Sequence, residues 1–357
     1  MKTHGTPFVG IATILRLIGA RGPEAFLAGL AEYIERDFRR WPRFEKSVRL
    51  ASHSSEGVIE LMPTSDGALY SFKYVNGHPG NTDVGKLTVT AFGVLADVAT
   101  GYPLLVSEMT IATAMRTAAT SAMAAKFLAR KDSSVMAIIG LGAQSEFQAL
   151  AFKAVLGVRR LRVFDIDRAA TLKFMANLAP YGFALVEAAS AEEAVRGADI
   201  VTTATAAKSR AAVLTRGMLE PGMHINAIGG DCQGKTEIDA EALKATSIFV
   251  EFPPQTRVEG EIQQLPPNAP VTELWRVIDG SAPGRRNADD MTLFDSVGFA
   301  IEDFSTLRYL GDLWAESGVD SRIDLVPDVP DPKNLFGLVG GGSAAIISAP
   351  FAQEAGG

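Results

Sequence analysis

A loop that carries an acid and a base four residues apart is the most informative chemical feature of this chain. The apolar stretch Ile225–Ile228 runs into two glycines, which are followed by Asp231 and then by Lys235. In α/β sheets, ligands and reacting groups gather on the loops that leave the carboxyl ends of the strands. A solvated surface turn could have the same sequence. The segment therefore predicts a proton-carrying carboxylate only if other residues of the chain also indicate a binding site.

A second glycine-containing loop predicts a nucleotide site. The continuous apolar run Val135–Ile139 leads into Gly140 and Gly142, and a helical pattern begins at Ser145. The first glycine allows a tight turn, and the second lets the backbone approach a pyrophosphate, which the amides of the helix N-terminus then bind. Ser145 replaces the usual third glycine, and it is small enough to keep the close packing.

An acid follows the next predicted strand, in the register that a dinucleotide site requires. The strand Leu161–Phe164 ends at Asp165, which lies 23 residues after Gly142. A carboxylate there hydrogen-bonds the adenosine ribose and repels a 2′-phosphate, so NAD is the expected cofactor rather than NADP. Arg168 weakens this preference, because it is a cation close to the same position.

Four charged residues stand isolated among apolar neighbours in the N-terminal third. Arg49, Glu60 and Lys73 interrupt alternating, strand-like segments, and Arg116 lies in an alanine-rich helical segment. A solvated face would explain any one of them. Three cations and one carboxylate around one cavity would suit a zwitterionic amino acid, since Arg and Lys bind carboxylates well. Burial of each charge without a ligand or a partner of opposite charge would cost several kcal/mol. We therefore expect these side chains either to bind a ligand or to pair with one another.

The elements that must position these residues follow from hydrophobic periodicity. Helical spacing covers residues 9–40, short strands with turns at Asp66-Gly67 and Asn76-Gly77 cover 47–107, and a helix covers 110–129. Strands and helices then alternate up to residue 250, and this alternation predicts an α/β fold with a doubly wound parallel sheet. A long helix is expected from about Gly298. The string from Gly340 to Ser343 lacks the lysine of a phosphate-binding loop and is predicted to be a flexible tail.

Composition excludes several classes of function. The 357 residues are 47% hydrophobic and carry a net charge of −7 with no basic stripe, which predicts no nucleic-acid partner. No apolar run approaches the roughly 18 residues of a membrane span, so no membrane partner is expected. Cys232 is the single cysteine, which excludes an intrachain disulfide and favours a cytoplasmic location. The histidines lack metal-ligand spacing, so no metal is predicted.

From about Phe8 to Leu338 the chain resembles the ornithine cyclodeaminase/μ-crystallin family. The strings GGDC-x-GKTE and EGEIQQL favour the cyclodeaminase branch over the reductases and alanine dehydrogenases that share the fold. Gln233 stands where proline is expected, which should alter loop stiffness but leave Asp231 and Lys235 in place. The resemblance is carried by Gly57–Ser65 (GVIELMPTS), Phe72–Pro79 (FKYVNGHP), Thr88–Gly93 (TVTAFG), Arg116–Ser121 (RTAATS), Gly140–Gln144, Gly229–Glu237 (GGDCQGKTE), Glu259–Leu265 (EGEIQQL) and Phe294–Asp303 (FDSVGFAIED).

This resemblance implies a domain organisation. A Rossmann-type NAD-binding domain over residues 131–300 would be inserted into an α+β substrate-binding and dimerisation domain made of residues 1–130 plus 301–357. The partner expected from this arrangement is a second copy of the chain, in a homodimer.

The resemblance also implies roles for particular residues. Asp231 would be the principal proton carrier, and Glu60 would face the substrate amino groups with it. Arg49, Lys73 and Arg116 would hold the substrate carboxylate, with Val297 packed near the substrate. The residues expected at the dinucleotide are Thr88, Arg116, Gly140, Gly142, Ala143, Gln144, Asp165, Thr205, Lys235 and Ser296.

The implied reaction is the conversion of L-ornithine to L-proline and ammonia, with the hydride removed and returned in one cycle, so that the protein is a cyclising, NAD-dependent ammonia-lyase. The side-chain amine must be neutral to attack, which is why a nearby carboxylate base is expected. An NAD(P)H-dependent cyclic imine (ketimine) reductase or an amino-acid dehydrogenase of the same family is the nearer alternative, and a non-catalytic binding protein is a more distant one. A lysine cyclodeaminase is a further alternative. Its substrate is one methylene longer than ornithine, and one methylene is worth only about 1–3 kcal/mol of discrimination.

Overall fold

The computed structural model describes residues 5–205 and 212–340. The chain divides into two compact units, the larger of which is Pro7–Ser321 and the smaller Met1–Thr6 with Arg322–Gly357. The smaller unit holds the short strand β15 (Arg322–Ile323) and the 3-10 turn η6 (Leu335–Leu338). The predicted flexible tail lies, beyond Gly340, outside the described residues.

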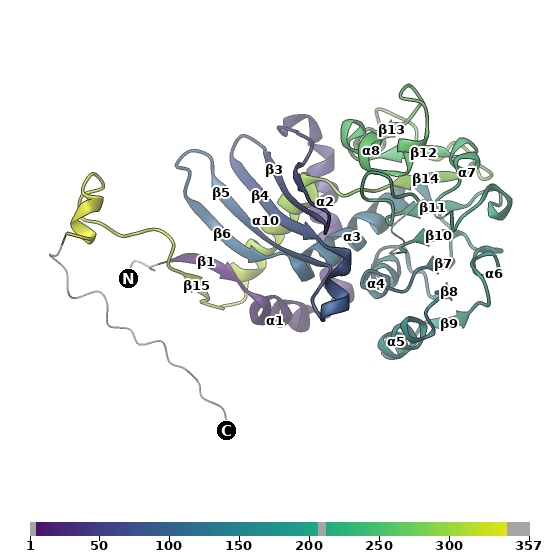
Figure 1. The fold of residues 1–357 in the computed structure, drawn as a ribbon, viewed down its shortest axis with the longest axis horizontal. Coiled ribbons are helices and arrows are strands. Elements are labelled where there is room, and N and C mark those ends of the chain that lie inside the picture. Colours follow the sequence, from purple (N-terminus) through teal and green to yellow (C-terminus); the bar gives the residue numbers. More distant parts are fainter. Residues whose placement is uncertain (1–4, 206–211, 341–357) are drawn as a thin grey trace. The chain divides into compact units, whose positions relative to one another are not determined.

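Within the larger unit, a mainly antiparallel sheet has the strand order β1-β6-β5-β4-β3-β2 (Figure 1). Only its β1–β6 pair is parallel. The predicted turn at Asp66-Gly67 is confirmed, because it joins β3 to β4. The strands are β1 (Thr6–Val9), β2 (Leu50–His53), β3 (Val58–Ser65), β4 (Leu69–Gly77), β5 (Val89–Asp97) and β6 (Pro103–Glu108).

The predicted turn at Asn76-Gly77 is wrong. Both residues belong to β4, and Asn76 pairs with Thr90 of β5. The side chain of Asn76 accepts a hydrogen bond from the Thr90 amide at 2.8 Å, so this asparagine stabilises strand pairing rather than a reversal of the chain. The reversal comes later, at the 3-10 helix η2 (Pro79–Val84).

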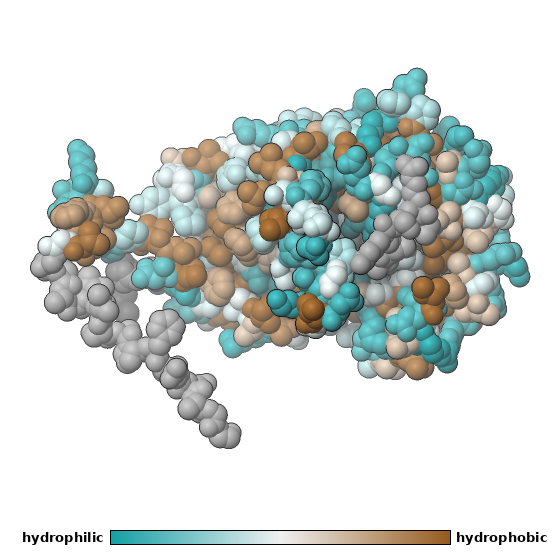
Figure 2. All heavy atoms as spheres, viewed as in Figure 1, coloured by the Kyte–Doolittle hydropathy of each residue, from teal (hydrophilic) through white to brown (hydrophobic). Residues whose placement is uncertain are grey.

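The two faces of this sheet differ in their surroundings. Its inner face packs against α10 (Ala300–Glu316) and α3 (Thr110–Leu128). On the outer face Leu50 lies opposite Leu61, Leu61 opposite Tyr74, and Tyr74 opposite Phe92. Leu50, Leu61 and Phe92 are all more than one-third exposed. Figure 2 shows hydrophobic side chains gathered over these strands. We call the exposed apolar surface of these four residues the outer sheet face.

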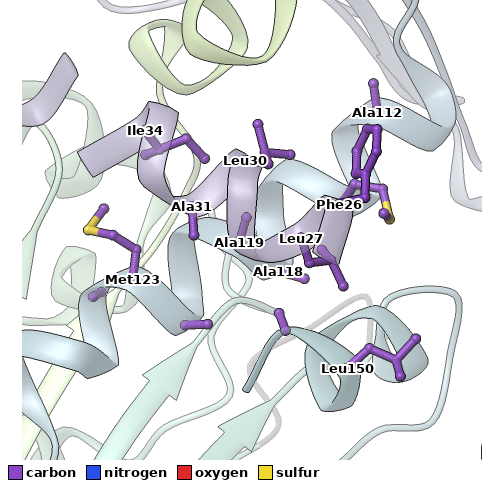
Figure 3. Close-up of a cluster of buried hydrophobic side chains, with 14 of the residues drawn as sticks. Phe26, Leu27, Leu30, Ala31, Ile34, Ala112, Ala118, Ala119, Met123 and Leu150 are labelled. Atoms are coloured by element: carbon purple, nitrogen blue, oxygen red, sulfur yellow. The ribbon is translucent and has the colours of Figure 1, made fainter. Parts of the chain in front are cut away.

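The predicted N-terminal helix is divided in two. Gly22 has φ of +78° and Pro23 follows it, so α1 (Ile11–Arg21) ends there and α2 (Pro23–Arg39) begins. The alanine-rich α3 lets neighbouring helices approach closely. Figure 3 shows side chains of α2, α3 and α4 (Ser145–Leu156) meeting in one cluster, with Phe26, Leu27 and Leu30 from α2, Ala118 and Ala119 from α3, and Leu150 from α4.

A second, fully parallel sheet has the strand order β13-β12-β14-β11-β10-β7-β8-β9. Successive residues of β7 enter different cores, with Met136 and Ile138 on one side and Ala137 and Ile139 on the other. Burial on both faces explains why this strand is a continuous apolar run. The strands are β7 (Val135–Ile139), β8 (Arg160–Phe164), β9 (Ala184–Glu187), β10 (Ile200–Thr203), β11 (His224–Ala227), β12 (Ser247–Val250), β13 (Thr272–Glu273) and β14 (Thr292–Asp295).

The prediction of an α/β fold with a dinucleotide-binding type of parallel sheet is confirmed. Helices cover both faces of the parallel sheet, with α4 and α5 packed into one core and α6 and α7 into the other. No helix in the ranges 5–205 and 212–340 is long and apolar enough to cross a membrane. The further elements are α5 (Arg168–Leu178), α6 (Ala191–Val195), α7 (Ala240–Lys244), α8 (Pro253–Glu259), α9 (Leu274–Ile278), η1 (Trp41–Arg43), η3 (Ala179–Tyr181), η4 (Arg216–Met218) and η5 (Glu261–Gln264).

Candidate active site

The carboxyl ends of the parallel strands bring most of the predicted site residues to one edge of the second sheet. In such sheets the ligand binds at this edge, where the strand order reverses. Here the order reverses between β7 and β10, which are neighbours although β8 and β9 intervene in the chain. The residues that follow the strand ends are Gly140 after β7, Asp165 after β8, Thr205 after β10, Gly229 and Asp231 after β11, Glu251 after β12 and Ser296 after β14.

The loop after β7 has the geometry of a phosphate-binding turn. Gly140 has φ of +93°, and a Cβ there would lie 2.6 Å from the Ala204 carbonyl carbon, so only glycine fits. A Cβ on Gly142 would meet no atom within 4 Å, which leaves this backbone open to a ligand. Gln144 precedes α4, and its Oε1 is buried without a hydrogen-bond partner among the residues that the structure describes. An orphaned polar atom beside an open glycine and a helix N-terminus fits a bound dinucleotide.

Asp165 is fixed beside this loop. Its carboxylate accepts hydrogen bonds from the backbone amides of Leu141 at 2.6 Å and Asp167 at 2.8 Å. Arg168, whose charge weakened the preference for NAD, forms an ion pair with Glu187. The charge of Arg168 is therefore paired with Glu187, while the Asp165 carboxylate lies next to the glycine turn.

Lys73 and Arg116 are brought together on a carboxylate that the sequence reasoning missed. Lys73 on β4 is 1% exposed, and its Nζ lies 2.8 Å from Asp303. Arg116 Nε donates to the same carboxylate at 3.1 Å, and its Nη1 donates to Glu302 at 2.8 Å. Burial and the neighbouring Arg116 lower the pKa of Lys73 to about 8, although Asp303 opposes the shift. Mutual pairing thus explains how these cations are buried.

The carboxylates of Glu302 and Glu251 extend this network toward Ser296. Burial raises the pKa of Glu302 to about 8, and Glu251 adds to the shift although Arg116 opposes it. Glu251 accepts a hydrogen bond from Ser296 Oγ at 2.7 Å. Gly298 makes room for Arg116, because a Cβ there would lie 2.5 Å from its Nη1. Both acids of the segment Ala-Ile-Glu-Asp-Phe lie in the first turn of α10, where acids are common for helix stability alone.

Arg49 joins the two sheets at the predicted substrate position. Its Nη1 donates to Glu60 at 2.9 Å, and its Nη2 donates to the Val297 carbonyl at 2.7 Å and the Gly298 carbonyl at 2.9 Å. Its Nε lies 3.1 Å from Oε2 of Glu259. Arg49, Glu60 and Val297 therefore meet as expected, and Glu259 is a fourth member that sequence reasoning did not single out.

The loop after β11 presents its acid to solvent and its base to the interior. Asp231 is 54% exposed, and its Oδ1 lies 3.1 Å from Nζ of Lys235, which is 16% exposed. Burial lowers the pKa of Lys235, but the Asp231 carboxylate more than offsets this, so the pKa is raised. Asp231 is therefore held by a charged hydrogen bond and is still accessible to a substrate.

The EGEIQQL string binds this loop through its backbone. Gln263 Oε1 accepts from the Gly234 amide at 2.7 Å, and its Nε2 donates to the Lys235 carbonyl at 3.1 Å. Glu261 accepts from the amides of Glu237 at 2.8 Å and Ile238 at 3.0 Å. The two strings that mark the cyclodeaminase branch are thus one structural unit.

Three buried carboxyl groups each fill the space above a glycine. Glu237 lies over Gly229, Glu261 over Gly230, and Asp295 over Gly260. Asp295 binds the amides of Glu261 and Ile262, and Glu237 binds the amide and hydroxyl of Thr205. We call Asp295, Glu261 and Glu237 the carboxyl ladder. It connects β14 to the β11 loop and to Thr205, and its contacts explain why the motifs need these glycines.

The carboxyl ladder holds acids close together in the interior. Burial raises the pKa of Asp295 well above its usual range and raises the pKa of Glu261 to about 7, and repulsion between neighbouring carboxyl groups adds to both shifts. Burial also raises the pKa of Glu237. The ladder is thus partly neutral near pH 7, which lessens the cost of burying its charges.

The other predicted residues lie as follows. Ala143 is exposed at the glycine loop. Thr88 lies in the other sheet's connection from η2 to β5, where its carbonyl accepts from the His78 amide at 2.9 Å. Within residues 5–205 and 212–340, no cluster of three His, Cys, Asp or Glu side chains is arranged to hold a metal ion. The absence of a metal stays a prediction.

Known proteins resemble this chain over most of its length. The chain is 61% identical over 333 residues to the ornithine cyclodeaminase of Agrobacterium fabrum, which covers 93% of this chain and 94% of the relative. It is 36% identical to the alanine dehydrogenase of Archaeoglobus fulgidus over 75% of this chain and 84% of that one. A solved lysine cyclodeaminase structure, described as recognising L-lysine, L-ornithine and L-2,4-diamino butyric acid, matches with a TM-score of 0.85 and 29% identity over 92% of this chain and 98% of that chain. The sequence model of the ornithine cyclodeaminase/mu-crystallin family matches residues 13–318, and the chain belongs to this family.

Proposed function

We propose that this protein is an ornithine cyclodeaminase, which converts L-ornithine to L-proline and ammonia with NAD as a cofactor that is not consumed. The observation that carries the proposal is the loop with Asp231 and Lys235, which the EGEIQQL segment hydrogen-bonds through Gln263 and links to Arg49 through Glu259. Two relatives that are about 60% identical over nearly the whole chain are named ornithine cyclodeaminase.

NAD fits the edge of the parallel sheet. The open backbone at Gly142, the buried orphan Oε1 of Gln144 and the fixed carboxylate of Asp165 match a pyrophosphate and a ribose. When bound, NAD supplies a hydride acceptor that becomes the donor later in the same turnover. We assign the cofactor contacts to Thr88, Arg116, Gly140, Gly142, Ala143, Gln144, Asp165, Thr205, Lys235 and Ser296.

The chain's own side chains bind the amino acid and move its protons. Arg49, Lys73 and Arg116 hold the substrate carboxylate, and Val297 packs beside it. Asp231 is the principal proton carrier, and Glu60 assists it at the amino groups. Loss of the hydride from Cα leaves an iminium, which the neutral side-chain amine attacks. Ammonia then leaves, and the cyclic imine is reduced to proline.

We also propose a homodimer built through the outer sheet face. Leu50, Leu61, Tyr74 and Phe92 form an apolar row across four neighbouring strands, and contiguous exposed apolar surface marks interfaces between proteins. A solved archaeal alanine dehydrogenase with a TM-score of 0.82 and 32% identity is described as a dimer with bound NAD. The substrate and dimerisation domain comprises residues 1–130 plus 301–357, and the NAD domain comprises 131–300. A cytoplasmic location stays a prediction.

Incubation of purified protein with L-ornithine and a substoichiometric amount of NAD⁺ tests the function. Proline and ammonia should form in equal amounts without net NADH. Steady accumulation of NADH would instead favour an amino-acid dehydrogenase, and activity only with a cyclic imine and NADH would favour a reductase. Parallel assays with L-lysine measure the preference between the two diamino acids.

A further inference from the structure

Glu259 is a carboxylate in the candidate site to which the family resemblance assigned no role. It is the last residue of α8, and its side chain is 15% exposed. Its Oε2 lies 3.1 Å from Nε of Arg49. Both of these atoms are buried, and neither makes a hydrogen bond within the described residues, so the side chain has an acceptor to offer a ligand.

Glu259 faces both halves of the site. The charged groups that act most strongly on it are Arg49, which precedes β2, Glu60 on β3, Asp231 after β11 and Glu251 after β12. Cys232 and its neighbour Lys235 lie on the same loop as Asp231, and Cys232 is also within electrostatic reach of Glu259.

Gln263 fixes Glu259 against the Asp231 loop. Its Nε2 lies 2.8 Å from the Gly260 carbonyl, 3.1 Å from that of Lys235, 3.2 Å from that of Glu259 and 3.3 Å from that of Cys232, and it shares its two hydrogens among these acceptors. The backbone on which Glu259 stands is therefore tied to the residue directly after Asp231.

The charge balance around Glu259 favours a further cation. Glu60 and Glu259 share the single guanidinium of Arg49, and Asp231 pairs with Lys235, so within the described residues three carboxylates are matched by two cations. Burial is the largest cause that raises the pKa of Glu259, to about 7, and the neighbouring carboxylates add to it. An acid with such a pKa can accept and return a proton near neutral pH. A diamino acid brings the missing ammonium group, whereas alanine does not.

We propose that Glu259 binds the side-chain ammonium of the diamino acid substrate and accepts its proton before ring closure. This inference rests on the proposed function. It assigns the distal amine to Glu259 and leaves the α-amino group to Asp231 and Glu60. It also accounts for the Glu-Gly-Glu sequence, in which the first acid serves the substrate and Glu261 serves the loop backbone.

The step balances without a further reactant. The distal ammonium gives one proton to the Glu259 carboxylate, and the freed nitrogen lone pair forms a bond to Cα of the iminium, whose C=N π electrons move to the α-nitrogen. A second proton passes from the ring nitrogen to the Asp231 carboxylate and from there to the α-nitrogen. Ammonia leaves with the Cα–N electron pair, the ring C=N bond forms, and Glu259 returns its proton to the departing ammonia.

The test compares two reactions of the same variant. Ornithine turnover needs the distal amine to lose a proton, whereas reduction of the cyclic imine Δ1-pyrroline-2-carboxylate by NADH starts after ring closure. We expect Glu259→Gln to lower kcat/KM for ornithine about 100-fold or more and to change imine reduction by less than about threefold. The rise of ornithine turnover with pH near 7 should disappear in the variant. Glu241→Gln, at an exposed acid that pairs with Lys244, is the matched control.

Three results would overturn the proposal. The first is unchanged ornithine turnover in Glu259→Gln. The second is an equal fall in both reactions, which would mean that Glu259 only orients Arg49. The third is a pH profile that keeps its limb near 7. Imine reduction and NAD binding show whether Glu259→Gln is folded. If it is not, ornithine turnover and imine reduction are measured in Glu259→Asp instead, and the ratio of the two rates is the readout. Wild-type protein without ornithine activity would instead refute the proposed function itself.

Discussion

The carboxylate of Glu261 accepts a hydrogen bond from the backbone amide of Glu237 at 2.8 Å. This contact joins the two strings that mark the cyclodeaminase branch, and it makes Glu261 part of the support for Asp231 rather than part of the chemistry. Because Glu237 in turn binds Thr205, the same contact connects the acid loop to a predicted cofactor residue. The position of the acid loop therefore depends on Glu261 and Glu237, which are not among the predicted substrate- and cofactor-binding residues.

Removing the charge of Glu261 should destabilise the protein. In Glu261→Gln an amide NH₂ faces one of the two backbone amides that the carboxylate now satisfies, and this leaves a buried donor without a partner. We expect a loss of about 1–3 kcal/mol in the free energy of unfolding, measured by urea denaturation. Ornithine turnover should also fall. Stability and turnover equal to wild type would show that the contact does not support the loop.

Filling the space above Gly229 should displace the acid loop. The backbone φ of Gly229 is not in the left-handed region, so the Cβ of Gly229→Ala acts only by colliding with the Glu237 carboxyl group. We expect a loss of turnover with the fold retained, measured by kcat together with circular dichroism. Gly217→Ala is the control, because a Cβ there meets no atom within 4 Å and should leave turnover unchanged. Equal turnover of the two variants would contradict the role of Glu237 in positioning the acid loop.

Replacing Asp231 by Asn should separate binding from catalysis. The neutral amide keeps the shape of the side chain but cannot take up a proton. We expect binding of NAD and ornithine to persist while kcat falls by about 10²–10⁴-fold, the usual contribution of a general base. Tryptophan fluorescence can follow binding, and proline formation can follow turnover. Turnover like that of the wild type would remove Asp231 from the mechanism.

Buried His224 should make the fold sensitive to acid. Burial and the neighbouring Arg285 lower its pKa from 6.5 to about 3. Between these values the unfolded chain binds a proton that the folded chain does not, so this residue's contribution to stability is lost as the pH falls below 6.5. At pH 5.5 the loss is about 1.4 kcal/mol.

Comparing the wild type with His224→Gln separates the effect of His224 protonation from that of the buried carboxyl groups, because those groups titrate in both proteins. Urea denaturation at pH 7.5 and pH 5.5 should show a pH-dependent loss that is smaller in the variant by about 1.4 kcal/mol. The same loss in both proteins would show that His224 is protonated in the folded state.

A charge on the outer sheet face should dissociate the proposed homodimer. Leu61→Lys places an ammonium group in the centre of that face, where association would desolvate it. Light scattering should find dimers for the wild type and monomers for the variant. Leu172→Lys on α5, at another exposed leucine outside the sheet, should remain dimeric. A monomeric wild type, or a dimeric Leu61→Lys protein, would contradict the assignment of this interface.

The sequence predicted those parts of the molecule that depend on local patterns. Continuous apolar strands, the glycine turn at Gly140 and the alanine-rich helix of Arg116 all follow from periodicity and from the limits on backbone conformation. The break at Gly22 and the true role of Asn76 were missed. The Gly22-Pro23 pair was a local signal for the break, whereas the cross-strand hydrogen bond of Asn76 is settled by tertiary packing, which the local sequence does not contain.

The carboxylates were the main omission in the site. Asp303 and Glu302 begin a helix, where acids are expected for helix stability alone, so their sequence position did not indicate that they bind Lys73 and Arg116. Glu259 and Glu261 lie more than 20 residues from the loop that they support. Only the fold brings the two segments together, and with them the pairing that allows so many charges to be buried.

The most direct test of the account is the fate of the α-hydrogen of ornithine. Purified protein would be given L-ornithine deuterated at Cα with a substoichiometric amount of NAD⁺, and the proline formed would be examined by mass spectrometry. The account predicts proline that retains deuterium at Cα, with one ammonia released for each proline and no accumulation of reduced cofactor. Proline that carries hydrogen at Cα, or reduced cofactor that accumulates in proportion to the ornithine consumed, would contradict it.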